Sequence, residues 1–280
     1  MMNIKRLALV FVLFVFVVGG CMAKAQNNSY VADVQNFAVS GWTADDEEHV
    51  WTLASVSTTA DADVYVVTVN ADVTGTIGAN FKVRLKDGGT TKYFGVLSVS
   101  AYSGGVTTLY LFGGTDYVLS GTISEFSYSV ARSPFGWPMN PDKWTIQISD
   151  VGDYAQASPV ANQWYNINSL KIILPAGLWV SGYDVYTEIR TSTTFATVYI
   201  TLSTSDVAES TPAFTRGVTN SDSTGTNVYA GNSLSAFLPV DVASETTFYL
   251  NTMTWYTSGV NIYNAGSLQP IIIRAVWGGL

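Results

Sequence analysis

The chain has 280 residues and a formal net charge of −8, with 48% hydrophobic but only 12% charged residues. The charged share is about half of the ~25% usual in globular proteins, and the acidic balance without a basic patch argues against nucleic-acid binding and against an anionic membrane surface as a partner of the mature chain. The one cysteine, Cys21, excludes an intrachain disulfide. The length suits two domains, since ~100–200 residues per domain is usual.

Residues 1–25 have the pattern of a targeting segment. Lys5 and Arg6 precede an apolar stretch, residues 7–18, which is shorter than the ~20 residues that cross a bilayer. We therefore expect a signal peptide. Val-Gly-Gly-Cys, ending at Cys21, resembles a bacterial lipobox, in which the cysteine is lipid-modified, whereas Ala-Lys-Ala at 23–25 fits ordinary signal peptidase. We favour the lipobox because the only cysteine occupies its required place; an unmodified leader cysteine, lost on cleavage, is the alternative.

The segment before the first clear strand is polar. We expect residues 26–44 to form an extended lead-in. The acidic run at 45–48 lacks the spaced oxygen ligands and central glycine of a calcium loop, which favours a solvated turn. His49, the only histidine, lies beside this run, and we expect it to be exposed or hydrogen-bonded there.

Residues 45–132 read as a small β domain. Short apolar stretches alternate with glycine turns and show no helical period, which predicts a small antiparallel β-barrel or sandwich. Residues 81–86 alternate apolar and basic, which predicts a strand whose outer face carries Lys82, Arg84 and Lys86. The expected strands are 50–56, 63–70, 81–86, 92–100, 106–112 and 123–130.

Residues 133–144, Ser-Pro-Phe-Gly-Trp-Pro-Met-Asn-Pro-Asp-Lys-Trp, contain three of the eight prolines. Proline fixes φ and removes an amide donor, so no helix or central strand can run through this segment. Phe135, Trp137 and Trp144 are too apolar for a free linker. We predict a stiff hinge with these three side chains as plugs.

Residues 145–280 read as a second β domain, which we expect to be a β-sandwich. Residues 179–190 form a long alternating strand, with Asp184, Glu188 and Arg190 on its polar face. Residues 151–161 and 204–233 are expected to be loops. The expected strands are 144–150, 170–174, 179–190, 197–203, 234–240, 246–255 and 268–277.

Several short motifs around the hinge occur in order: Lys-Tyr-Phe at 92–94, Gly-Gly-Thr-Asp-Tyr at 113–117, Ser-Pro-Phe-Gly-Trp-Pro at 133–138 and Asp-Lys-Trp at 142–144. This series resembles a block in virion structural proteins of tailed phages and prophages, of tail-fibre or receptor-binding type. The resemblance covers residues 80–144 and implies that a small β domain leads into a C-terminal sandwich. The later half is similar in pattern to a jelly roll of the tumour-necrosis-factor-like kind, which implies a homotrimer. The leader departs from the phage pattern.

Chemistry-bearing motifs are scarce. One histidine and one cysteine leave no zinc cluster, and no phosphate-binding loop is present; we predict no cofactor, no metal site and no catalytic residue. The sequence does not exclude a pair of carboxylates for glycoside hydrolysis, but nothing in the spacing singles out two of the acidic residues. The candidate ligand-binding residues are aromatics in or beside turns, where sugar rings can stack. For each residue taken alone, a role in the core or in a subunit contact is favoured. These residues are Trp255, Tyr256, Tyr263 and Tyr229.

The function we expect is non-enzymatic: a phage-type virion structural protein that recognises a host-surface glycan or protein through several copies of its C-terminal sandwich. Its location would be the virion. The alternative is an exported or membrane-anchored bacterial lipoprotein, attached only through Cys21, with a glycan- or protein-binding sandwich. A jelly-roll glycosidase or lyase is a third interpretation.

Overall fold

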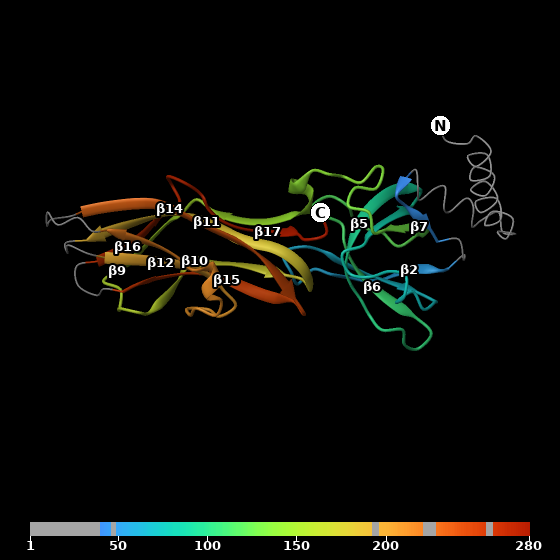
Figure 1. The fold of residues 1–280 in the computed structure, drawn as a ribbon, viewed down its shortest axis with the longest axis horizontal. Helices are drawn as coiled ribbons and strands as arrows, with labels where there is room; N and C mark the ends of the chain where they lie inside the picture. The colour runs from blue at the N-terminus through green and yellow to red at the C-terminus, as the bar shows by residue number, and fades with distance from the viewer. Residues whose placement is uncertain (1–39, 46–48, 192–195, 221–227, 256–259) are drawn as a thin grey trace, which may run out of the picture.

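The computed structural model describes residues 40–45, 49–191, 196–220, 228–255 and 260–280. Strands dominate these residues, and their helical turns are two short 3-10 segments, η1 (Pro141–Trp144) and η2 (Pro212–Phe214). The predicted all-β class is therefore confirmed. The molecule is elongated, with one sheet at the N-terminal end, a sandwich at the other and the C-terminus near the junction (Figure 1). The predicted leader, including Cys21, and most of the lead-in lie outside the described residues.

The N-terminal part is one antiparallel seven-stranded sheet in the order β1-β7-β4-β5-β6-β3-β2. A bridge between Thr52 and Thr122 brings β2 toward the start of β7, but the described residues show no pairing of the edge strands β1 and β2 with each other. The N-terminal part, predicted to be a small barrel or sandwich, is therefore not a closed barrel. The strands are β1 (Thr43–Ala44), β2 (Trp51–Ser57), β3 (Val64–Val69), β4 (Lys82–Asp87), β5 (Thr90–Val99), β6 (Thr107–Phe112) and β7 (Ile123–Ser129).

The C-terminal part is a sandwich of two antiparallel sheets. Its ten strands are β8 (Thr145–Asp150), β9 (Asp153–Ala157), β10 (Trp164–Leu174), β11 (Gly177–Thr191), β12 (Ala196–Ser203), β13 (Arg216–Asn220), β14 (Val228–Val242), β15 (Thr246–Thr254), β16 (Val260–Ala265) and β17 (Ile271–Trp277). The β15 sheet has the order β10-β15-β12-β13. In the β11 sheet, β11 pairs with β14 on one side and with β17 and β16, end to end, on the other. Beyond these lie β8, paired with β17, and β9, paired with β16.

These pairings are those of a jelly roll. If β8 and β9 count as one interrupted strand, and β16 and β17 as another, each sheet has four strands, as in a jelly roll. The break between β8 and β9 lies beside the break between β16 and β17. A Cβ at Gly266 would lie 2.2 Å from the carbonyl oxygen of Gly152, so the two breaks cross at a distance that only glycine permits. The predicted jelly-roll sandwich is confirmed.

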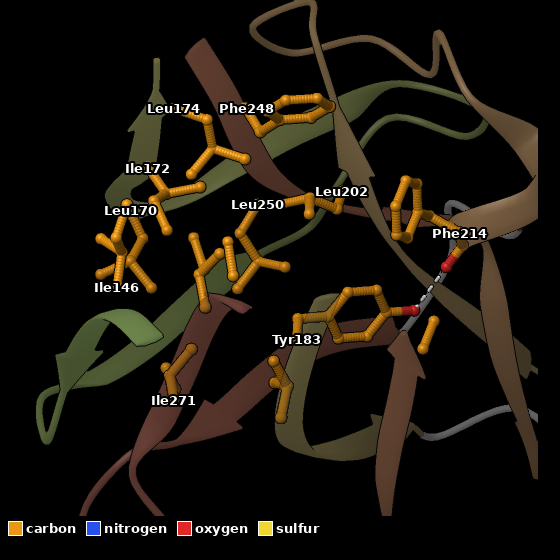
Figure 2. Packing of buried hydrophobic residues seen from close by; sticks show 14 of the residues in the cluster. Ile146, Leu170, Ile172, Leu174, Tyr183, Leu202, Phe214, Phe248, Leu250 and Ile271 are labelled. Carbon is orange, nitrogen blue, oxygen red and sulfur yellow. Dashed lines mark hydrogen bonds between the residues drawn. The ribbon is translucent and has the colours of Figure 1, made fainter. Parts of the chain in front are cut away.

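The sandwich core comes from both sheets. Tyr183 of β11 is fully buried, and its hydroxyl donates to the carbonyl oxygen of Phe214 at 2.7 Å (Figure 2). Burial raises the pKa of this hydroxyl, so the hydrogen bond stays formed across the ordinary pH range. The following side chains from the two sheets face one another around it: Ile172, Leu174, Leu202, Phe248, Leu250 and Ile271 (Figure 2).

Two predicted loops are wrong. Residues 151–161 contain β9, an edge strand with alternately exposed residues and no apolar run. Residues 204–233 contain η2, β13 and the first residues of β14. β16 and the first half of β10 were also not expected. These segments are rich in polar residues and are held by pairing with neighbouring strands, so hydrophobic periodicity does not reveal them.

The hinge joins the two parts through one aromatic cluster. The indole rings of Trp137 and Trp144 stack with centroids 4.5 Å apart and an interplanar angle of 6°. Trp277 of β17 lies 5.7 Å from Trp144, and Phe112 of β6 meets Trp144 edge-on at 6.0 Å. Trp42, from the end of the expected lead-in, lies 6.4 Å from Trp137. The cluster is continuous with the sandwich core, so the sheet and the sandwich share buried side chains.

Two expectations about this region are wrong. Phe135 is 78% exposed and does not plug the hinge; its backbone carbonyl instead accepts the indole N–H of Trp42 at 2.8 Å. Lys82 is only 3% exposed, so β4 does not present a simple basic outer face. The Lys82 Nζ donates to the Gly279 carbonyl at 2.5 Å and lies 5.3 Å from the Trp137 ring centroid. This face of β4 covers the aromatic cluster, and burial lowers the pKa of Lys82.

Replacing Trp144 by alanine should lower the free energy of unfolding of the full chain by about 3–5 kcal/mol, because a fully buried indole is lost from a packed cluster. Phe135→Ala, three-quarters exposed in the same segment, should change it by about 0.5 kcal/mol or less. Urea denaturation followed by far-ultraviolet circular dichroism measures both. Equal losses in the two variants would contradict the assignment of the hinge to the core.

Candidate functional site

The candidate aromatics from the sequence do not form one site. Tyr256 lies outside the described residues, and Tyr229 belongs to β14, where its backbone pairs with that of Arg190. Tyr263, in β16, pairs with Glu188 on β11, whereas Trp255 follows β15 in the opposite sheet. Trp255 and Tyr263 therefore belong to different sheets, and their side chains lie on opposite outer faces of the sandwich.

Tyr263 is already engaged by neighbouring side chains. Its hydroxyl donates to the Asp153 carboxylate, and the Arg190 guanidinium lies 3.6 Å from the ring centroid. Arg190 also donates to Glu188 at 2.9 Å. The hydrogen bond to Asp153 raises the pKa of Tyr263, and the same bond lowers the pKa of Asp153. The phenol tip and one ring face are thus occupied, which favours a structural role that ties β9, β11 and β16 together.

Trp255 is free on one side. Its side chain is 58% exposed, and its ring meets Tyr199 edge-on, with centroids 6.2 Å apart and an interplanar angle of 76°. The Trp255 backbone N–H donates to the Thr197 carbonyl at 3.3 Å. Tyrosine and tryptophan are enriched at interfaces, but a single exposed aromatic is ordinary, so the neighbours of Trp255 decide whether it belongs to a binding surface.

Two further aromatics share this surface. Val198 and Ile200 of β12 are fully buried, so the alternation of a strand places Tyr199 on the outer face. Met253 is directly opposite both Tyr199 and Trp164 in the strand register. A row of half-buried side chains, Trp164, Met253 and Tyr199, thus crosses three strands. We name this row together with Trp255 the aromatic platform.

Sequence reasoning found only Trp255 among the platform residues. Residues 197–203 were expected to form a strand, but the neighbours of Tyr199 depended on strand register. Trp164 was missed because β10 was expected to begin at residue 170. The register of β10 shifts between Asn166 and Lys171, and this bulge interrupts the periodicity that would have extended the strand back to Trp164.

A second concave region lies where the N-terminal sheet meets the sandwich. A cavity of about 570 Å³ is lined on the sheet side by residues that include Asp63 and Asp116, and on the sandwich side by Thr145 and Gln147. Asp61, also in its wall, accepts the Ile173 backbone N–H at 2.6 Å and so ties the sheet to β10. Within the described ranges, no cluster of histidine, cysteine or carboxylate side chains could hold a metal ion.

Lys143 is the buried charge beside this cavity. Lys143 is 8% exposed. Its Nζ donates to the Gly113 carbonyl at 3.1 Å and to the Asp116 carboxylate, and the same Nζ lies 3.5 Å from the Tyr117 ring centroid. Burial lowers the pKa of Lys143 to about 8. These contacts link the turn after β6 to the hinge.

The acidic residues of the jelly roll do not gather in a cleft. Asp184 and Glu188 point outward from one strand, four residues and hence about 13 Å apart along it, which exceeds the carboxylate spacing of retaining and inverting glycosidases. Asp184 accepts from the Gln269 amide at 3.0 Å. Glu209, on the chain after β12, accepts from the Thr215 hydroxyl. No helix in the described part of the chain has the length and apolar character to span a bilayer.

Comparisons with known proteins give weak likenesses. No family model and no curated protein matches the chain. Among solved structures, an infectious bursal disease virus Gt strain chain is 13% identical, with 75% of this chain and 47% of that chain covered and a TM-score of 0.26. PorU from Porphyromonas gingivalis is 10% identical, with 81% and 24% covered and a TM-score of 0.27. The tandem CBM22 domains of Paenibacillus barcinonensis Xyn10C are 12% identical, with 86% and 95% covered and a TM-score of 0.21. These TM-scores carry no argument about function.

The stability of the protein should rise with pH through the titration of Lys143. The folded pKa is about 8 and the ordinary value is 10.5, so between these values the unfolded chain binds more protons at this residue, and the free energy of unfolding increases with pH. Relative to Lys143→Met, the wild-type chain should gain about 1–2 kcal/mol between pH 7.5 and pH 9.5. Urea titrations at both pH values measure this difference; parallel shifts in the two proteins would contradict it.

Proposed function

We propose that this protein is a non-enzymatic structural and recognition protein of the phage-virion type, in which the jelly roll contacts a surface glycan or protein. The observation that carries the proposal is that the sequence motifs resembling those of virion proteins contact one another in the structure. Each motif contributes to the same joint between the N-terminal sheet and the jelly roll, so the series encodes a fixed connection of two parts.

The contacts within the joint are specific to the motif residues. A Cβ at Gly136, where φ is +83°, would lie 2.7 Å from the Tyr93 hydroxyl. A Cβ at Gly114, where φ is +69°, would lie 2.5 Å from the Lys143 carbonyl oxygen. Only glycine suits either position, because both the backbone angle and the space exclude a side chain. The motifs thus place the jelly roll at the end of a rigid arm, which suits presentation of a binding surface.

Recognition by several copies is the proposed mechanism. Weak single contacts add through effective concentration when one assembly presents several identical surfaces. The outer face of the β11 sheet offers a contact surface between copies. On it, Val180 is 39% exposed and lies opposite the half-buried Val276, and the Arg274 guanidinium lies 4.5 Å from the centroid of the half-buried Phe237 ring. Ile272 continues this apolar face.

Ile272→Lys should lower the oligomer mass and leave a folded monomer, because Ile272 lies on the outer face directly opposite Asp184, which can pair with the new charge. Ile273→Lys should unfold the jelly roll, since Ile273 is fully buried in the core. Light scattering on the full chain, with circular dichroism as the folding check, measures both. A wild-type chain that is monomeric at micromolar concentration would remove the trimer and the multivalent mechanism.

The leader provides the second candidate, an exported lipoprotein, because Cys21 completes a lipobox-like sequence. Cys21→Ser should then abolish labelling by a radioactive fatty acid and release the protein from the membrane fraction, since several acyl chains anchor firmly. Unchanged partitioning of the variant into detergent would remove the lipoprotein interpretation. Mass spectrometry of the mature N-terminus provides the independent check on cleavage.

Binding of the fluorescently labelled full chain to a panel of bacterial cells tests the proposed function directly. We expect saturable binding to some strains, which excess unlabelled protein displaces. Binding to no strain, by an assembly shown to be oligomeric, would argue against a recognition function.

A further inference from the structure

The aromatic platform has a fixed spacing across the β15 sheet. Trp164 and Tyr199 both lie opposite Met253 in the strand register, one on each neighbouring strand. Adjacent strands are about 4.8 Å apart, so the two aromatic positions are separated by about 9–10 Å. This distance matches the length of a disaccharide unit in an extended glycan chain.

Two rings of the platform, those of Tyr199 and Trp255, contact neighbouring residues before any ligand binds. The Tyr199 ring lies over Gly217 of β13, where a Cβ would be 2.9 Å from two of its ring carbons. Trp255 meets the same ring edge-on, and its backbone is fixed by the hydrogen bond to Thr197. Side chains that are already ordered reduce the entropy cost of binding.

The rows beside the platform are polar. On one side, the Asn166 amide donates to the Asn251 side-chain oxygen at 3.3 Å, and the hydroxyl oxygens of Thr201 and Thr215 lie 3.1 Å apart. On the other side, the hydroxyl groups of Thr197 and Thr219 lie 3.0 Å apart. Asn251, Thr201 and Thr197 are buried, whereas Asn166 is half-buried and Thr219 is exposed. The Glu209 carboxylate contacts Thr215, in a chain with a formal net charge of −8, which disfavours an anionic ligand.

A segment after β12 borders the platform on one side. The Asn251 amide donates to the carbonyl oxygens of Ser205 at 3.0 Å and Ala208 at 2.9 Å. These bonds hold the segment over the row next to the platform.

We propose that the aromatic platform binds a neutral glycan chain, with every second pyranose ring stacked, one on Trp164 and the next but one on Tyr199, and with Trp255 contacting the chain beside Tyr199. A pyranose ring has an apolar C–H face and a rim of hydroxyl groups, which match the aromatic rings and the flanking amides and hydroxyls. This inference rests on the proposed recognition function and names the ligand class and the residues that bind it. A protein partner is the competing occupant, and the experiment separates the two.

The experiment titrates the full chain with hexasaccharides of β-1,4-linked glucose, xylose and mannose, and with an oligogalacturonate as the charged probe. Calorimetry and intrinsic tryptophan fluorescence follow binding. We expect millimolar or tighter affinity for at least one neutral hexasaccharide, weakened at least fivefold by Trp164→Ala and by Trp255→Ala. Gly217→Ala should also weaken binding, because its Cβ displaces the Tyr199 ring without removing it. Phe135→Ala, exposed on the hinge, is the matched control and should leave affinity unchanged.

Circular dichroism and thermal melting confirm that each variant is folded; if Trp164→Ala is not, Trp255→Ala and Gly217→Ala carry the test. Absence of binding to all neutral hexasaccharides at about 10 mM, binding that the platform variants leave unchanged, or binding only of the oligogalacturonate would each overturn the proposal. Cell binding by the same variants distinguishes failure of the glycan proposal from failure of the recognition function. Cell binding that persists in the platform variants and is lost when the cells are treated with protease would retain the recognition function and assign it to a protein partner elsewhere on the molecule.

Discussion

The stack of Trp137 on Trp144 is the contact on which the architecture depends. Each of these indoles comes from the short segment between the N-terminal sheet and the jelly roll, and the rings they touch come from both parts. Because the two parts share one buried cluster, rotation about the hinge would expose aromatic surface to water, at a cost of about 25 cal/mol per Å². The jelly roll is therefore held at a defined angle to the sheet.

The same cluster explains where two lysines are buried. Lys82 and Lys143 both place their ammonium groups against aromatic rings and backbone carbonyl oxygens at this joint. Cation–π contacts and carbonyl acceptors offset part of the loss of hydration, but burial still lowers both pKa values. The joint thus combines apolar packing with directional contacts, which together select one arrangement of the two parts.

With the joint fixed, the two outer faces of the jelly roll have different characters. The face of the β11 sheet carries apolar side chains near the joint and the ionic network of Arg190, Glu188 and Asp153 at the far end. The face of the β15 sheet carries the exposed Trp255 and the half-buried Tyr199 and Trp164 among polar groups. One face is suited to contact with another copy and the other to a ligand, so assembly and recognition need not compete for the same surface.

The sequence by itself determined the all-β class, the burial of Trp137 and Trp144, and the two faces of residues 179–190, because prolines, glycine turns and alternation act locally. Polar edge strands such as β9 and β13 could not be predicted, since pairing with longer strands stabilises them. Only the tertiary structure decided that Lys82 is buried, that Phe135 is exposed and that Trp164, Tyr199 and Trp255 share one face. Those outcomes depend on which strands lie opposite one another, and the bulge between Asn166 and Lys171 of β10 is enough to change which side chains meet.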